Sequence, residues 1–157
     1  MTNQYNFLRS QNDAPARILS SNLDGPAASW AAHLSNIPAH DCLYHSRAGG
    51  ENVYYICHEV PISEAYLARQ AAKEFYDEIS FYDYLHPGTV RRAAHFTNVV
   101  WKAVRYMGIG LSVRNFTDHH GGCNIHASPV VIHESPNANI MTTKDFSVVR
   151  PFRYFHF

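Results

Sequence analysis

The chain contains 157 residues, with 13 Lys and Arg against 13 Asp and Glu, so its formal charge at pH 7 is zero. This length suits one domain, the hydrophobic fraction of 46% excludes a disordered chain, and the neutral balance argues against a nucleic-acid partner. The 11 histidines are unusual. Histidine is the commonest metal ligand and titrates near neutrality, so this number of histidines predicts a net charge that rises just below pH 7.

The first third of the sequence favours two helices followed by a loop. Residues 2–12 favour a short helix, and Pro26 suits the first turn of a second helix that runs to Leu34. The apolar face of this second helix, spaced i, i+3, i+4 and i+7, consists of Ala27, Trp30, Ala31 and Leu34. The sequence SRAGGEN at residues 46–52 predicts a loop.

The clearest helix follows Pro61, with Ser63 as its N-cap and an uninterrupted run to Ile79. Its apolar stripe comprises Ala68, Ala71, Ala72, Phe75 and Ile79. Glu78 lies seven residues after Ala71 and therefore points in nearly the same direction as the stripe. A buried carboxylate is costly without partners, so Glu78 is predicted to have a structural or functional role.

The rest of the chain favours one helix and several strands. Residues 96–105 predict a short helix, and residues 107–113, 130–132 and 146–149 predict strands. The segment 135–139 predicts the turn that follows the second of these strands. Helices that precede strands, with short connections, indicate an α+β domain with an antiparallel sheet.

Cysteine usage indicates a reducing compartment. The three cysteines, Cys42, Cys57 and Cys123, form no CxxC pair, which argues against a disulfide framework and against a zinc knuckle. The first residues lack the pattern of a signal peptide, and no apolar run approaches the length of a membrane span. We therefore expect an intracellular protein, with a secreted protein whose leader has been removed as the alternative.

Several segments occur in an order that resembles a known family. Residues 94–102 (AHFTNVVWK) resemble the His-aromatic-Thr-x-x-x-Trp signature of the CAP superfamily of cysteine-rich secretory, antigen and pathogenesis-related proteins. Segments 6–9 (NFLR), 43–46 (LYHS), 50–52 (GEN) and 74–79 (EFYDEI) match other elements of this family in order and spacing. The resemblance covers about residues 3–140 and implies that residues 1–157 form a single CAP domain, a three-layer α-β-α sandwich with a central antiparallel sheet and a cleft at its edge.

Within the superfamily, the sequence most resembles the intracellular, Golgi-associated branch. Positions where the secreted branches carry disulfide cysteines here hold Ala93 or Ala94, Ile109 and a residue near Ile132. The sequence also departs from the usual pattern at Phe75, Glu134 and Ala138, which replace a Trp, a Tyr and a Gly.

The resemblance further implies that His45, Glu51, Glu78 and His95 converge in the cleft. Two imidazoles and two carboxylates permit three roles. The histidines could bind a divalent cation such as Zn²⁺, weakly, with the carboxylates orienting the rings. Glu51 or Glu78 could act as a general base in hydrolysis, or the four groups could form a structural hydrogen-bonded network.

We expect a non-catalytic binding protein, because no recognisable nucleophile motif accompanies these residues. The family resemblance implies binding of sterol or lipid, association with an anionic membrane surface, and possible homodimers. The alternatives are a metal-dependent hydrolase or protease, and an effector or immune-modulating protein that binds a protein partner.

Three other features carry weaker functional hypotheses. The cluster Asp118, His119, His120, Cys123 and His126 could form an accessory metal loop or a solvated turn. The basic and aromatic segment 150–157 could contact a membrane or pack on the domain. Cys57, followed by His58, could be an activated thiol or a reduced structural cysteine.

Overall fold

The computed structural model of the chain describes residues 1–37, 45–46, 49–87, 91–117 and 124–139. Its α-helices are α1 (Thr2–Ser10), α2 (Ser21–Ser35), α3 (Glu64–Asp77) and α4 (Ala94–Val100), with short 3-10 helices η2 (Glu78–Phe81) and η3 (Arg91–Ala93). Its strands are β1 (Ile18–Leu19), β2 (Gly50–His58), β3 (Tyr106–Leu111), β4 (Arg114–Thr117) and β5 (Asn124–Ser135). The predicted strand at residues 146–149 lies outside the described residues.

One five-stranded sheet organises the fold, with the order β1-β3-β5-β2 and with β4 also paired to β5. The long strand β5 pairs in antiparallel fashion with β2, β3 and β4. The prediction of an antiparallel sheet needs one correction, because the two-residue strand β1 pairs with β3 in parallel. Strand β2 lies at the opposite edge of the sheet from β1 among the described residues.

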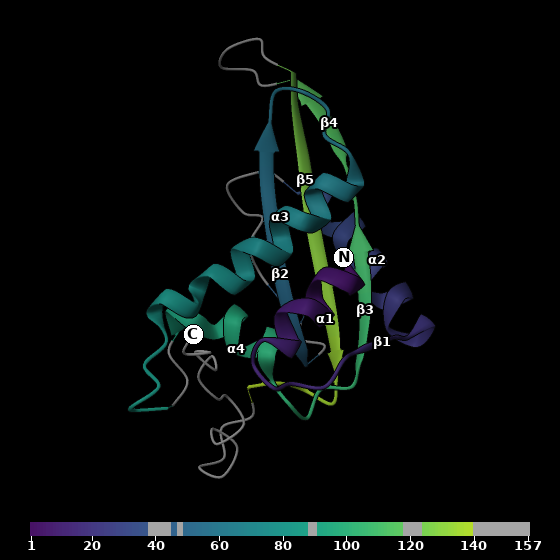
Figure 1. The fold of residues 1–157 in the computed structure, drawn as a ribbon. Coiled ribbons are helices and arrows are strands. Elements are labelled where there is room, and N and C mark those ends of the chain that lie inside the picture. The colour runs from purple at the N-terminus through teal and green to yellow at the C-terminus, as the bar shows by residue number, and fades with distance from the viewer. Residues whose placement is uncertain (38–44, 47–48, 88–90, 118–123, 140–157) are drawn as a thin grey trace.

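Helices cover both faces of this sheet, which confirms the predicted three-layer α-β-α sandwich. Figure 1 shows α1, α3 and α4 in front of the strands and α2 behind them. Helix α2 packs on β3 and β5, whereas α3 and α4 pack on β2 and on each other. No helix among the described residues is both long and apolar enough to cross a membrane.

Each face of the sheet has its own hydrophobic core. Val131 and Val53 pack with the buried residues of α2, whereas Val130 and Ile132 pack with the front helices and with Phe96. Successive side chains of a strand point to opposite faces, so β5 supplies both cores from consecutive positions. By the same alternation, Glu51 of β2 and His133 of β5 lie on the face of the sheet that packs on α2.

Helix α2 begins earlier than predicted. It starts at Ser21, so Pro26 lies inside the helix rather than in its first turn. The first turn closes because the backbone N–H groups of Leu23 and Asp24 both donate to the carbonyl of Ser20, at 2.9 and 3.0 Å. The predicted apolar face is confirmed at Ala27, Ala31 and Leu34, all fully buried.

Helix α3 matches its predicted start. The hydroxyl of Ser63 accepts a hydrogen bond from the backbone N–H of Tyr66 at 3.2 Å, as an N-cap should. The predicted stripe is buried at Ala68, Ala71, Ala72 and Phe75. The α-helix ends at Asp77 rather than Ile79, because the chain tightens there into η2, and Ile79 is only partly buried.

The predicted loop at 46–52 is wrong in its second half. Residues 50–52 belong to β2, because they pair with the end of β5 in the register Gly50 opposite Glu134 and Glu51 opposite His133. The predicted helix at 96–105 is also displaced, since α4 runs from Ala94 to Val100.

The early end of α4 has a specific cause. The buried guanidinium of Arg9 donates to the carbonyls of Val99, Trp101 and Val104, at 2.7, 3.0 and 3.0 Å. These acceptors are therefore satisfied by a side chain from α1, and the chain turns toward β3 instead of continuing the helix. The predicted strands at 107–113 and 130–132 correspond to β3 and to the centre of β5.

Candidate functional site

The first half of the site is built around Glu51 of β2. One carboxylate oxygen, Oε1, contacts Nδ1 of His45 at 2.7 Å and accepts the backbone N–H of Ser46 at 2.9 Å. The other, Oε2, accepts the Ser46 hydroxyl at 2.6 Å and contacts Nε2 of His133 at 2.8 Å. The Glu51 carboxylate therefore makes four hydrogen bonds, to three residues, while its side chain is only 1% exposed.

The second half pairs Glu78 with His95. Oε1 of Glu78 contacts Nδ1 of His95 at 2.7 Å. Oε2 accepts the backbone N–H groups of His95 and Phe96, at 2.9 and 3.3 Å. Glu78 thus closes the first turn of α4, where backbone N–H groups lack partners within the helix. The sequence predicted that the Glu78 carboxylate needs hydrogen-bond partners, and its partners among the described residues belong to α4.

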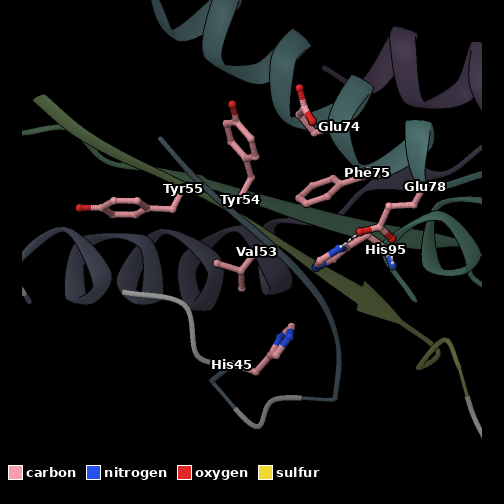
Figure 2. A pocket seen from close by; sticks show the side chains of 8 residues that line it. All are labelled: His45, Val53, Tyr54, Tyr55, Glu74, Phe75, Glu78 and His95. Carbon is pink, nitrogen blue, oxygen red and sulfur yellow. Dashed lines mark hydrogen bonds and ion pairs between the residues drawn. The ribbon is translucent and has the colours of Figure 1, made fainter. Parts of the chain in front are cut away.

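The two halves lie on opposite faces of the sheet and meet around the edge strand β2. Glu51 has the same parity as Val53, which faces α2, whereas Tyr54 faces the front helices. Figure 2 shows His45 and Val53 on one side of β2, and Glu78 and His95 on the other. Because β2 is an edge strand among the described residues, groups from both of its faces can border one pocket.

Two asparagines connect these halves through the sheet. The side-chain amide of Asn98 on α4 donates to Oδ1 of Asn52 at 2.7 Å and to the carbonyl of Glu51 at 3.2 Å. Asn52 in turn donates to the carbonyl of His95 at 3.1 Å. Both amides are buried, so strand β2 and helix α4 are held in fixed relation.

A pocket of about 380 Å³ lies at this edge of the sheet (Figure 2). It is lined by His45, Val53, Tyr54, Tyr55, Glu74, Phe75, Glu78 and His95. Of the four residues predicted to converge, His45, Glu78 and His95 line the pocket, and Glu51 lies behind His45. The ring of Phe75 packs 5.1 Å from that of His95, centroid to centroid, so the aromatic wall adjoins the polar end.

Hydrogen bonding dominates the electrostatics of the Glu51 half. Burial alone would raise the pKa of Glu51, but the hydrogen bonds from His133, His45 and Ser46 outweigh it and hold that pKa well below its usual value. The hydrogen bond to Glu51 raises the pKa of His45, against a smaller opposing effect of burial. Glu51 is therefore a carboxylate throughout the physiological range.

This arrangement suits metal binding better than acid–base catalysis. Both imidazoles hydrogen bond to a carboxylate through Nδ1, which leaves Nε2 as the coordinating atom, as in carboxylate–histidine–metal triads. The side chains of His45 and His95 are 57% and 34% exposed. No group of three or more His, Cys, Asp or Glu side chains suited to a metal occurs among the described residues.

The two candidate general bases are both engaged. Glu51 does not line the pocket, and its lowered pKa makes it a poor proton acceptor. Glu78 lines the pocket, but both of its oxygens accept hydrogen bonds from α4.

Sequence reasoning missed two residues of the site, Ser46 and His133. His133 shares a sheet face with Val131 and is 4% exposed, so a histidine at a buried position of β5 was the available signal. Its contact with Glu51 depends on the β2–β5 register, which the predicted loop obscured.

Most residues of the remaining sequence hypotheses lie outside the described part of the chain, so those hypotheses stay predictions. Residues 118–123 and 150–157 lie outside it, as does the side chain of His126. Cys57 is exposed and free, but the ring of His58 is directed elsewhere, with Nδ1 2.6 Å from the carbonyl of Val60 and Nε2 3.0 Å from the Ser128 hydroxyl. Both ring nitrogens of His58 thus contact groups other than the Cys57 thiol.

Comparison with known proteins agrees with this architecture. The chain is 27% identical over 108 residues to the Golgi-associated plant pathogenesis-related protein 1 of Homo sapiens, a match covering 68% of this chain and 66% of that protein. It is 51% identical over 37 residues to protein PRY2 of Saccharomyces cerevisiae, covering 24% of this chain and 11% of the yeast protein. The chain thus spans less than two thirds of the length of both curated relatives.

The fold is shared with solved structures, including a crystal structure of NaASP2 with Zn²⁺. That structure superposes with a TM-score of 0.61 at 17% identity, over 95% of this chain and 82% of that one. The family model described as CAP, the cysteine-rich secretory protein family, matches residues 2–125. These residues include the α4 signature, the Glu51 strand and both histidines that line the pocket, and the chain belongs to the CAP family.

Proposed function

We propose that this chain is a non-catalytic binding protein whose pocket holds a divalent cation through His45 and His95 and accepts a sterol or another neutral lipid beside it. One observation carries the proposal: each of the two imidazoles that line the pocket is held at Nδ1 by its own carboxylate, at 2.7 Å. These carboxylates fix the tautomer in which Nε2 carries the coordinating lone pair.

Zinc is the cation that this donor set favours, because neutral imidazole is among its preferred ligands. The presence of Zn²⁺ in the crystal structure of NaASP2, which shares this fold, supports the choice. With two protein ligands, water or a bound molecule would complete the coordination, so we expect weak, reversible binding. The ion would supply a local positive charge beside an otherwise acidic pocket.

The lining of the pocket supports a neutral lipid. Val53, Tyr54, Tyr55 and Phe75 form its apolar wall, and its charged residues are the carboxylates Glu74 and Glu78. No Lys or Arg occurs among the described lining residues, so a negatively charged headgroup would face repulsion unless the cation offset it. The volume of about 380 Å³ lies at the lower end of ordinary ligand pockets.

We extend the proposal to association with a membrane surface, inside the cell and at the Golgi. The name of the human relative, Golgi-associated plant pathogenesis-related protein 1, supports this location. Association through a second copy of the chain, as a homodimer, is a further possibility that follows from the family rather than from any feature of the described residues.

Calorimetric titration of the metal-free protein with Zn²⁺ tests the metal site. We expect saturable binding that the double variant His45→Ala/His95→Ala abolishes and that His33→Ala/His86→Ala, which changes two histidines away from the pocket, leaves intact. Unchanged binding in the first double variant would show that the ion binds elsewhere, for instance at His119–His126, and would contradict this part of the proposal.

Titration with a fluorescent sterol tests the lipid part separately. Saturable binding should be displaced by unlabelled sterol and weakened by Tyr54→Ala, which removes part of the apolar wall. Tyr106→Ala is the matched control, because Tyr106 is a half-exposed aromatic residue on β3, away from this pocket. Absence of saturable sterol binding by the wild-type protein would contradict the lipid part of the proposal.

A further inference from the structure

We propose that His133 is a positioning residue that acts through Glu51 to fix the tautomer and orientation of His45. The proposal extends the metal site proposed above, since it explains how one of its two imidazoles is held ready. Its central claim concerns the metal-free protein, so it can be tested even if zinc does not bind.

The chain of contacts runs from the sheet interior to the pocket. His133 lies on β5 directly opposite Glu51 on β2, and its Nε2 is 2.8 Å from Oε2 of Glu51. Glu51 then reaches His45 through Oε1, at 2.7 Å. The first two groups of this path are buried and the last is exposed: the side chains of His133 and Glu51 are 5% and 1% exposed, whereas that of His45 is 57% exposed.

The protonation pattern follows from hydrogen-bond chemistry. An ionised carboxylate only accepts hydrogen bonds, so every group bonded to Glu51 must be a donor. His133 therefore carries its proton on Nε2, and His45 carries one on Nδ1. Neutral His45 is left with its lone pair on Nε2, which is the tautomer a metal requires at that atom.

Loss of His133 would disturb this pattern at its buried end. Oε2 of Glu51 would keep only the Ser46 hydroxyl, at 2.6 Å, and a buried carboxylate with a missing donor is costly. The carboxylate can regain a partner by rotating or by binding a proton. Either change weakens the acceptor that holds Nδ1 of His45 and frees the ring to adopt its other tautomer.

The other imidazole provides an internal control. Glu78, which holds His95, is fixed by two backbone N–H groups of α4 rather than by a buried side chain. A change at His133 should therefore affect His45 and leave His95 unaltered. A general loss of packing would affect both rings.

The first measurement uses the wild-type protein without metal. Long-range ¹H–¹⁵N NMR spectra of the histidine rings should show the proton on Nε2 of His133 and on Nδ1 of His45. A His133 ring that is neutral and protonated on Nδ1 would overturn the proposal, because it could not donate to Glu51.

The second measurement uses two variants. In His133→Leu, His45 should populate both tautomers while His95 keeps its own. Zinc affinity should fall about tenfold, as is usual when a group that orients a metal ligand is lost. His133→Gln, which keeps an N–H donor, should recover most of both effects, and His58→Gln, at the other end of the β2–β5 ladder, should cause neither. An unchanged His45 spectrum in folded His133→Leu, or equal changes at His45 and His95, would overturn the proposal.

Discussion

Glu51 illustrates how one carboxylate can serve both stability and function. It is buried, yet its four hydrogen bonds, from His133, His45 and Ser46, keep its pKa far below the usual value. An ionised group that is stabilised by the fold stabilises the fold in return. The same carboxylate orients the exposed imidazole of His45. The groups that stabilise this edge of the sheet therefore also position a residue that lines the pocket.

Glu51→Gln should lower the free energy of unfolding by about 2 kcal/mol at pH 7, because two imidazoles and Ser46 lose a charged acceptor. The folded-state pKa of Glu51 lies below its unfolded value of about 4.3, so its stabilisation is complete above that pH and declines as the pH falls toward the folded value. Urea unfolding at pH 7 and at pH 3 measures the difference, which should shrink at the lower pH.

Glu59→Gln is the control for this prediction, since Glu59 is an exposed carboxylate just after the same strand. It should change stability by less than about 0.5 kcal/mol. An equal loss in the two variants, or a Glu51→Gln effect that grows in acid, would contradict the role assigned to Glu51.

Individual residues of the site were predictable to the extent that they lie in local motifs. His95 lies in the segment 94–102, and Glu78 was singled out by its place on the helix stripe. His133 could not be found in this way, because it meets Glu51 across 82 residues of sequence. Such a contact depends on strand register, which a short segment of sequence does not encode.

At the scale of elements, the layer behind the sheet depends on close backbone packing between α2 and β3. A Cβ atom added at Gly110 would lie 2.0 Å from the carbonyl oxygen of Ala27, and one added at Gly108 would lie 2.2 Å from the carbonyl carbon of Leu23. These atoms are helix backbone and cannot move away individually. The two glycines therefore allow α2 to lie directly on the strand.

Gly110→Ala should destabilise the protein by about 3 kcal/mol or more, because the whole of α2 would have to shift from the sheet. Gly25→Ala is a matched control within α2, where an added Cβ meets nothing within 4 Å apart from its chain neighbours. That change should alter stability by less than about 1 kcal/mol, because the greater helix preference of alanine is opposed by contact of its Cβ with the ring of Pro26. Thermal unfolding of both variants checks the prediction, and similar melting temperatures would contradict it.

Elements were predictable where local signals agree with tertiary packing. The Ser63 cap and the apolar stripe after it located α3 almost completely. Strand β2 was missed at Gly50–Asn52 because its glycine and polar residues resemble a loop, and pairing with β5 decides its conformation. The end of α4 was missed because the side chain of Arg9, 90 residues away in the sequence, binds the carbonyl of Val99 near the end of the helix.

At the scale of the whole molecule, protonation should act in opposite directions on the two proposed activities. Metal binding requires neutral imidazoles. The hydrogen bond to Glu51 raises the pKa of His45, so protonation of His45 begins to oppose metal binding at a pH above the ordinary pKa of histidine. The whole chain, in contrast, has 11 histidines on a background of 13 positive and 13 negative residues. It gains net positive charge as the pH falls.

We therefore expect binding to vesicles containing phosphatidylserine to strengthen between pH 7.5 and 5.5, while zinc affinity falls over the same range. Anionic lipid attracts positive charge near its surface, and this attraction is screened by salt. Flotation of the protein with phosphatidylserine vesicles and with neutral phosphatidylcholine vesicles measures the first effect, and calorimetry measures the second. High salt should remove the gain on anionic vesicles. A vesicle affinity that is independent of pH, or one that weakens in parallel with zinc binding, would show that membrane contact does not arise from the overall charge.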